Sequence, residues 1–362
     1  MDMVIYTLPF GDPVHRFDGN IVVHLNGKRK VLSTAMRNGG YREDLKYVYN
    51  HDGRCHLGVA SAMNGKDIHE HTLNTILSMG LDPEVSAGME TAAHMENVSI
   101  KTEVWDGYTS VTAIVTGGIE TNGGRVGDPG EYIESEDVPY EHRLGTINIM
   151  LAIDADLSPG CMTRALVTCT EAKTAAIQEL LAPSRYSRGL ATGSGTDSTV
   201  LIANADSPKY LTSAGKHSKL GELIGKAVKA AVKEALYLQT GLCPASQHDA
   251  FKRLDRFGIT EEGVFRFYRR QGGELERPDF SHRMEKITMS GDGVALASVV
   301  AHLIDQMDWE LLTGDETVHA ARLMMEGYAN GHGLSFVWTD GDKADEAVLH
   351  NWQRLLILEI EK

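Results

Sequence analysis

Residues 146–154, TINIMLAID, carry the clearest fold signal in this chain of 362 residues. Large aliphatic residues alternate through the segment, at Ile147, Ile149, Leu151 and Ile153. A period of two places these side chains on one face of a β-strand. The segment therefore predicts a buried strand.

Helical patterns follow this strand. Ser158-Pro159 supply an N-cap and a first-turn proline, and an apolar stripe follows at Met162, Leu166, Cys169, Ala172, Ala176 and Leu180. A strand is predicted over 199–203. A long helix is predicted after Gly215-Lys216-His217, because apolar residues recur there at helical spacing: Leu220, Leu223, Ile224, Ala227, Val228, Ala231, Val232 and Leu236.

Two hairpins are predicted before the 146–154 strand. The first has its turn at Asn26-Gly27, between strands over 21–25 and 28–33. The second has its turn at Asp106-Gly107, between 98–105 and 108–117, with Val111, Ala113 and Val115 on one face. Both dipeptides tolerate the positive φ angles of a two-residue turn.

Two helices are predicted between these hairpins. Asp67 and Glu70 have the spacing of a capping box, which predicts a helix start. Asp82-Pro83 predicts a second, short helix that continues through His94. On that helix Glu90 and His94 would form a surface pair one turn apart.

The sequence pattern changes near Cys243, where mixed strand and helix signals give way to mostly helical ones. Helical patterns cover 294–307, 315–329 and 343–361. We therefore predict an α+β domain over 1–242, with a largely antiparallel sheet packed by helices, and a mostly helical C-terminal extension over 243–362.

Composition excludes several classes of function. The chain has 35 basic and 50 acidic residues, and its net charge of −15 disfavours nucleic acid and anionic membrane surfaces as partners. Its four cysteines lack CxxC spacing, which argues against a zinc ribbon and a disulfide framework. No apolar run approaches the length of a membrane span and no signal sequence is evident, so we expect a cytoplasmic protein.

Familiar catalytic motifs fail on inspection. Gly215-Lys216 is no nucleoside-triphosphate loop, because Tyr210 replaces the first glycine and His217 replaces the hydroxyl residue. The loop ATGSGTDS (191–198) lacks the first glycine of a hydrolase elbow. In His69-Glu70-His71 the two imidazoles point apart on a helix, so we expect a solvated helix face rather than a metal site.

A cluster of reactive residue types survives. Loop 191–198 contributes Thr192, Ser194, Thr196 and Asp197, and His217 precedes the following helix. A hydroxyl, a carboxylate and an imidazole can activate a nucleophile, and glycine amides can stabilise an oxyanion. The alternative is a tight turn whose side chains satisfy only local backbone groups.

Two further regions carry candidate site residues. Glu171 lies beside the apolar stripe of its helix, where partial burial would raise its pKa, although a surface ion pair is the default for such a residue. The loop over 117–129 is rich in glycine and polar residues, and loops of this kind often line binding sites.

Seven segments resemble, in order and spacing over about residues 15–240, the CbiZ-type adenosylcobinamide amidohydrolases of corrinoid salvage. They are LSTAMRNGGYREDLKYVYN (32–50), GMETAAHMENV (88–98), GGIETNGGRVGDP (117–129), GTINIML (145–151), TEAKTAAIQEL (170–180), ATGSGTDS (191–198) and AGKHSKLGELIGKAV (214–228). The family pattern favours GTGTD where this chain has GSGTD, and Ser194 keeps the hydroxyl. Residues 243–362 lie outside the resemblance.

The resemblance implies hydrolysis of the amide that joins the aminopropanol arm to the corrin ring, which yields adenosylcobyric acid and 1-amino-2-propanol. Cobalt would arrive with the substrate, so no cofactor and no metal ligand set is expected. The corrinoid is the expected partner, without nucleic acid or membrane, and self-association stays open.

From the chemistry of this reaction we assign two sets of residues. The expected catalytic residues are Asp197, His217, Glu171, Ser194 and Thr196. The expected substrate contacts are Thr192, Asn122, Arg125, Asp128, Asn38 and Lys216. Two other functions stay open: a non-catalytic corrinoid carrier, and an amidohydrolase that acts on another amide.

Overall fold

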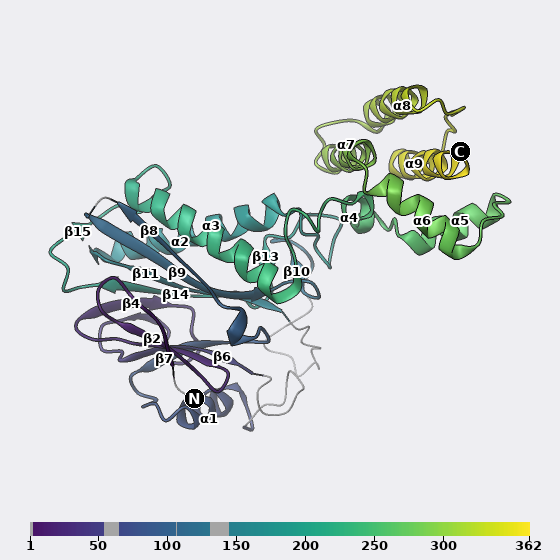
Figure 1. The fold of residues 1–362 in the computed structure, drawn as a ribbon. Coiled ribbons are helices and arrows are strands. Elements are labelled where there is room, and N and C mark those ends of the chain that lie inside the picture. The colour runs from purple at the N-terminus through teal and green to yellow at the C-terminus, as the bar shows by residue number, and fades with distance from the viewer. Residues whose placement is uncertain (1–2, 54–64, 106, 131–144) are drawn as a thin grey trace. The chain divides into compact units, whose positions relative to one another are not determined.

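The computed structural model describes residues 3–53, 65–105, 107–130 and 145–362. The chain divides into two compact units, Met1–Cys243 and Pro244–Lys362 (Figure 1). The turn residue Asp106 lies outside the described residues.

The first unit contains two main sheets, both mostly antiparallel. The first sheet has the order β1 (Met3–Thr7), β2 (Pro13–Phe17), β3 (Asn20–His24), β6 (Tyr47–Asp52) and β7 (Ser86–Thr91). The second sheet has the order β5 (Gly40–Arg42), β4 (Arg29–Ser33), β14 (Ser198–Asn204), β11 (Thr146–Ile153), β9 (Thr109–Gly118) and β8 (Ser99–Trp105). Only β6–β7 and β11–β14 pair in parallel within these two sheets, as far as the described residues show.

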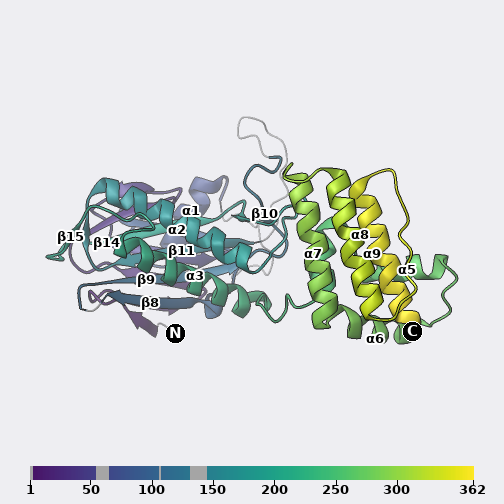
Figure 2. The same ribbon diagram turned by 90° about the horizontal axis from the view of Figure 1, so that it is seen from above.

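Helices cover the outer faces of the stacked sheets, so the first unit has four layers (Figures 1 and 2). Helices α2 (Pro159–Glu179) and α3 (Lys219–Thr240) pack on the second sheet, and α1 (Ile68–Ser78) lies on the first sheet. A short 3₁₀ helix, η1 (Met95–Asn97), leads into β8. The predicted α+β class is confirmed.

Strand β11 lies at the centre of this arrangement, and all eight of its residues are buried. Ile147 and Ile149 pack toward α2 and α3, whereas Met150 and Ala152 face the first sheet. Burial of each large aliphatic side chain stabilises the fold by about 1.5–3 kcal/mol. The alternation seen in TINIMLAID is therefore confirmed, with a second apolar face that the pattern did not reveal.

The predicted first hairpin is wrong, although both of its strands exist. Strand β3 pairs with β2 and β6 in the first sheet, whereas β4 pairs with β5 and β14 in the second. The buried Arg29 guanidinium binds Asn204 on β14 of the second sheet and Asp12, which directly precedes β2 of the first sheet, so its contacts join the two sheets. Asn26-Gly27 thus connects two layers rather than two neighbouring strands. The second hairpin, β8–β9, is confirmed.

The predicted helix over 82–94 is also wrong, because this segment forms β7. Ala87 and Met89 alternate into the core between the sheets, and the backbone pairs with β6. Glu90 and His94 are therefore not one helical turn apart. Parallel pairing with a distant strand outweighs the local proline signal.

Two shorter strand pairs complete the first unit. One pair is β12 (Asp156–Leu157) with β15 (Tyr210–Leu211), and the other is β10 (Gly123–Gly124) with β13 (Gly193–Ser194).

The second unit is helical. Its elements are α4 (Ala250–Leu254), η2 (Asp255–Phe257), α5 (Glu261–Arg270), α6 (Arg277–Thr288), α7 (Gly291–Asp308), α8 (Gly314–Gly331) and α9 (Ala344–Glu361). Its core includes Tyr268, Phe280 and Trp352. Among the described helices, none alone has the length and apolarity to cross a membrane. Helices α6 and α7 together meet these criteria of length and composition, but the pair is bent by 76°.

Candidate functional site

The two glycine-rich loops of the first unit meet through the β10–β13 pair. Gly123 lies opposite Ser194, and Gly124 lies opposite Gly193. The Thr192 amide donates to the carbonyl of Gly124 at 2.8 Å, and the Val126 amide donates to Oγ1 of Thr192 at 2.9 Å. Loops 117–129 and 191–198 therefore form one continuous wall.

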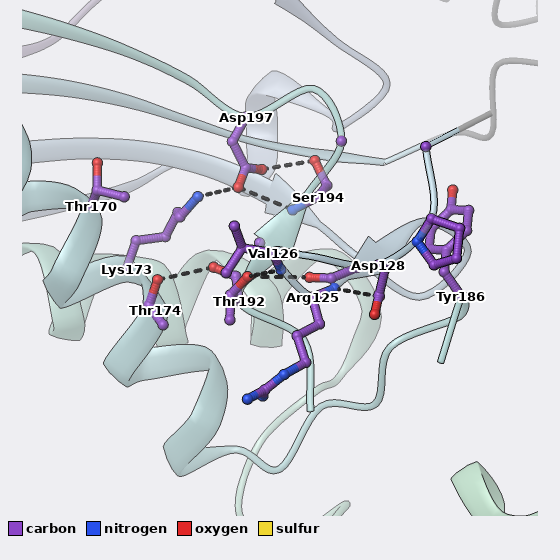
Figure 3. Close-up of a pocket in the computed structure, with 15 residues that line it drawn as sticks. Arg125, Val126, Asp128, Thr170, Lys173, Thr174, Tyr186, Thr192, Ser194 and Asp197 are labelled. Atoms are coloured by element: carbon purple, nitrogen blue, oxygen red, sulfur yellow. Dashed lines mark hydrogen bonds and ion pairs between the residues drawn. The ribbon is translucent and has the colours of Figure 1, made fainter. Parts of the chain in front are cut away.

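A pocket of about 590 Å³ opens between this wall and helix α2 (Figure 3). Five residues expected at the site line it: Arg125, Asp128, Thr192, Ser194 and Asp197. Helix α2 adds Thr170, Lys173 and Thr174, none of which was expected there. Residues from both loops therefore line one pocket.

Asp197 is the centre of the hydrogen-bond network in the pocket. Its Oδ1 accepts from the Ser194 hydroxyl at 2.7 Å and from the Ile147 amide at 2.9 Å. Its Oδ2 accepts from the Ser194 amide at 3.0 Å and from the ammonium of Lys173. Four donors thus fix the carboxylate, and the Ser194 hydroxyl is directed at it.

Lys173 comes from α2 and is almost entirely buried, with only 11% of its side chain exposed. Figure 3 shows Lys173 and Ser194 reaching the carboxylate of Asp197 from two sides. Burial of an ammonium is costly unless a carboxylate neutralises it. The Lys173–Asp197 pair therefore links the helix to the loop inside the pocket wall.

Gly193 makes this close approach possible. A Cβ at this position would lie 2.7 Å from Nζ of Lys173 and would overlap the carboxylate of Asp197. At Gly195, two residues away, a Cβ would meet nothing within 4 Å. The first glycine of the GSG sequence is thus required by packing, and the second is not.

Asp128 occupies the opposite side of the pocket from α2. Its Oδ2 accepts from the Ser184 hydroxyl at 2.6 Å and from the Arg125 amide at 2.8 Å. Burial acts to raise the pKa of Asp128, but hydrogen bonds from Ser184, Ser187 and the Arg125 amide hold it below its ordinary value. Asp128 is therefore a carboxylate at neutral pH.

Cys169 is a buried thiol close enough to Lys173 to feel its charge. Burial raises the pKa of Cys169 to about 12, and the nearby charge of Lys173 only partly opposes this. A thiol that stays protonated at neutral pH does not attack a carbonyl. The Ser194 hydroxyl, by contrast, is hydrogen-bonded to the Asp197 carboxylate.

The structure does not place His217 and Glu171 in this pocket. His217 is exposed, precedes the N-cap Ser218 of α3, and does not line the cavity. Glu171 is 42% exposed at its side chain and pairs with Lys216 at 3.0 Å, also outside the pocket. The expected meeting of the His217 imidazole with loop 191–198 in one cavity is therefore corrected.

The remaining expected residues have backbone-directed contacts. Thr196 is exposed and donates to the carbonyl of Gly145, and the buried Asn122 donates to the same carbonyl. Asn38 has a positive φ of 56° and donates to the carbonyls of Pro83 and Ser86. These three side chains do not line the pocket.

His71 also departs from expectation. Its side chain is only 12% exposed, and its Nε2 lies 2.7 Å from Oε2 of Glu90 on β7. The expected solvated face is therefore wrong for His71, because β7 lies beneath α1. Among the described residues, no group of His, Cys, Asp and Glu has the arrangement of a metal site.

Lys173 is the residue that sequence reasoning missed. It follows Cys169 by four positions and precedes Ala176 by three, so it lies on the apolar stripe of α2. A lysine at a core position of an amphipathic helix is a signal for a buried carboxylate partner. The β10–β13 pair had no such signal, because two-residue strands have no periodicity.

Comparison with known proteins agrees with the sequence resemblance. Residues 9–244 match the family described as adenosylcobinamide amidohydrolase, CbiZ. The chain belongs to this family. The match covers most of the first unit and ends where the helical unit begins.

Two relatives align with most of the region that matches the family. An uncharacterized protein of Methanocaldococcus jannaschii is 37% identical over 230 residues, which cover 60% of this chain and 86% of the relative. The adenosylcobinamide amidohydrolase of Methanosarcina mazei is 27% identical over 223 residues, which cover 59% of this chain and 94% of the relative.

Solved structures give only weak likenesses. The PH0078 protein of Pyrococcus horikoshii is 14% identical, with a TM-score of 0.31, over 65% of this chain and 82% of that chain. The L-aminopeptidase D-Ala-esterase/amidase of Ochrobactrum anthropi is 12% identical, with a TM-score of 0.27, over 66% of this chain and 81% of that chain. TM-scores this low do not establish a shared fold.

Proposed function

We propose that this protein hydrolyses the amide between the aminopropanol arm and the corrin ring of adenosylcobinamide. The products would be adenosylcobyric acid and 1-amino-2-propanol. Family membership supports the substrate class, and the Methanosarcina mazei relative bears the name of this activity. The substrate brings its own cobalt, so no resident cofactor is proposed.

The observation that carries the chemistry is the 2.7 Å hydrogen bond from the Ser194 hydroxyl to Asp197 inside the pocket. A hydroxyl held against a carboxylate can transfer its proton as its oxygen attacks a carbonyl carbon. The backbone and Lys173 contacts of Asp197 keep this carboxylate in place.

The reaction proceeds in two stages from this arrangement. Ser194 Oγ bonds to the amide carbon, its proton passes to Asp197, and the carbonyl π electrons move onto the oxygen. The carbonyl re-forms, the C–N bond breaks, and the nitrogen takes the proton from Asp197 and leaves as 1-amino-2-propanol. Water then adds to the Ser194 ester and gives a proton to Asp197, which returns it to Ser194 Oγ as adenosylcobyric acid departs.

The size and polarity of the pocket suit one part of a corrinoid. Sites of ~300–1,000 Å³ hold drug-sized ligands, so a pocket of about 590 Å³ suits the side arm and the adjacent ring edge. Arg125, Asp128 and Thr192 offer donors and acceptors for the carboxamides on that edge. We propose these three residues as substrate contacts.

The test is release of 1-amino-2-propanol from adenosylcobinamide by the purified full-length protein. We expect wild-type turnover, and a loss of about 10³-fold or more in kcat for Ser194→Ala, because the nucleophile is removed. Mass spectrometry of wild-type protein quenched during turnover should show the corrinoyl ester on the peptide that contains Ser194. Unchanged kcat in Ser194→Ala would assign the attack to water.

The same assay separates the alternative functions. A coloured protein–corrinoid complex that yields no product would identify a carrier. Absence of both binding and product would leave the third possibility, an amidohydrolase acting on a different amide, and would overturn the proposed substrate.

A further inference from the structure

We infer that Lys173 is a catalytic residue that donates a hydrogen bond to the scissile carbonyl oxygen. This inference rests on the proposed function and assigns a role that the ion pair with Asp197 alone does not require. The proposed role is catalytic because the oxygen of an amide gains negative charge when a nucleophile adds to its carbon, and a hydrogen bond from Lys173 would stabilise that charge.

The donor capacity of Lys173 exceeds its use in the structure. A protonated lysine has three N–H donors. In the ranges 3–53, 65–105, 107–130 and 145–362, Asp197 is the sole hydrogen-bond acceptor of Nζ. Only 9% of the residue is exposed, so bulk water can satisfy few of the unused donors.

The position of the ammonium matches the position that an oxyanion donor needs. Lys173 lines the pocket, and its Nζ and the Ser194 hydroxyl bind the two oxygens of the same carboxylate. A carbonyl group whose carbon approaches Ser194 Oγ therefore has its oxygen within reach of Nζ. Catalytic sites place nucleophile and oxyanion donor ~3 Å from the reacting group in this manner.

Asp197 then has two functions that do not conflict. Its Oδ1 accepts the proton of Ser194, while its Oδ2 holds the ammonium at a fixed point. The packing at Gly193 allows Nζ to lie this close to the loop backbone. A preorganised charge in a water-poor pocket stabilises a developing oxyanion more strongly than a solvated charge does.

The test compares Lys173→Ala with Lys229→Ala in the full-length protein, using adenosylcobinamide. Lys229 is the matched control, because it also forms an ion pair that involves α2, with Glu179, but is 39% exposed and does not line the pocket. We expect kcat of Lys173→Ala to fall about 10²–10³-fold, as for loss of one oxyanion donor. KM should change less than about 3-fold, because the lost contact forms mainly in the transition state. Lys229→Ala should retain wild-type kcat.

Chemical rescue distinguishes a donor from a structural clamp. Methylammonium added to Lys173→Ala should restore part of kcat in a saturable manner, whereas tetramethylammonium, which has charge but no N–H donor, should not. Equal rescue by both ions would show that charge alone is needed and would overturn the donor role.

A second variant, Lys173→Gln, tests the same role if Lys173→Ala does not fold. Lys173→Gln keeps an N–H donor on the side chain but loses the charge, and it should bind the coloured corrinoid while kcat falls at least about 10-fold. Wild-type kcat in a folded Lys173→Ala or Lys173→Gln variant would overturn the role of Lys173 alone. Absence of turnover by the wild-type protein would overturn the proposed function, and the role of Lys173 with it.

Discussion

Helix α2 carries two ion pairs of the same chemistry, only two residues apart, with opposite surroundings. Lys173 and Asp197 are 11% and 13% exposed at their side chains, whereas Glu171 and its partner Lys216 are 42% and 57% exposed. Solvent screens the second pair, so its net attraction is small. The first pair must stay intact, because a lone charge in the pocket wall would be poorly solvated.

This difference in burial between the two ion pairs explains why residue type alone did not locate the site. Sequence reasoning chose Glu171 because a carboxylate on a helix next to an apolar stripe can act as a base. The stripe itself contains Lys173, and the rotation of about 100° per residue turns Glu171 outward. Burial, rather than the presence of a charge, separates the two positions.

The largest expected effect comes from Lys173→Met. This change leaves Asp197 without its cation, and breaking a buried pair from one side costs ~3–5 kcal/mol of unfolding free energy. Calorimetry of the full chain measures the loss. The double variant Lys173→Met/Asp197→Asn should recover part of the stability, and equal stability of wild type and single variant would contradict the buried-pair description.

Gly193→Ala should have the next largest effect. The added Cβ would displace Lys173 or Asp197, and overpacking of this kind costs ~1–3 kcal/mol. Gly195→Ala is the control, since its Cβ meets nothing within 4 Å and should change stability by less than ~0.5 kcal/mol. Urea unfolding measures both, and a reversed order would show that the GSG loop is not packed against α2.

Ser184→Ala tests the carboxylate on the far side of the pocket. The hydroxyl of Ser184 stabilises ionised Asp128, so its loss should cost ~1–2 kcal/mol at neutral pH and raise the pKa of Asp128. A depressed pKa in the folded state adds stability above the unfolded pKa of ~3.9, and this stability is lost as pH falls through the folded value. The gap between wild type and variant should therefore shrink as the pH falls below the unfolded pKa of ~3.9, and a gap independent of pH would exclude the ionic explanation.

The smallest effect is expected for Glu171→Ala. Exposed pairs contribute ~0–1 kcal/mol, and high salt should remove even this difference. Thermal unfolding at low and high salt measures it. A loss of stability as large as that of Lys173→Met would show that the exposed and the buried ion pair of α2 contribute equally to folding.

Local patterns predicted much of the fold. Strand β11, the β8–β9 pair and helices α2 and α3 lie where periodicity and capping residues placed them, because each depends on neighbours in the chain. The errors, at β3–β4 and at β7, occurred where a partner far along the chain determined the structure. In the first case the partner of β4 is β14, which lies far along the chain.

The candidate site divides in the same way. The loops that carry the hydroxyls and carboxylates are recognisable from local sequence, since Ser194, Asp197 and Asp128 lie in glycine-rich segments. Three features of the site are seen only in the folded chain. The β10–β13 pair joins those loops, Lys173 lines the pocket, and His217 lies outside it. The physical reason is that hydrogen bonding and burial between distant segments depend on packing of whole layers, which no local spacing records.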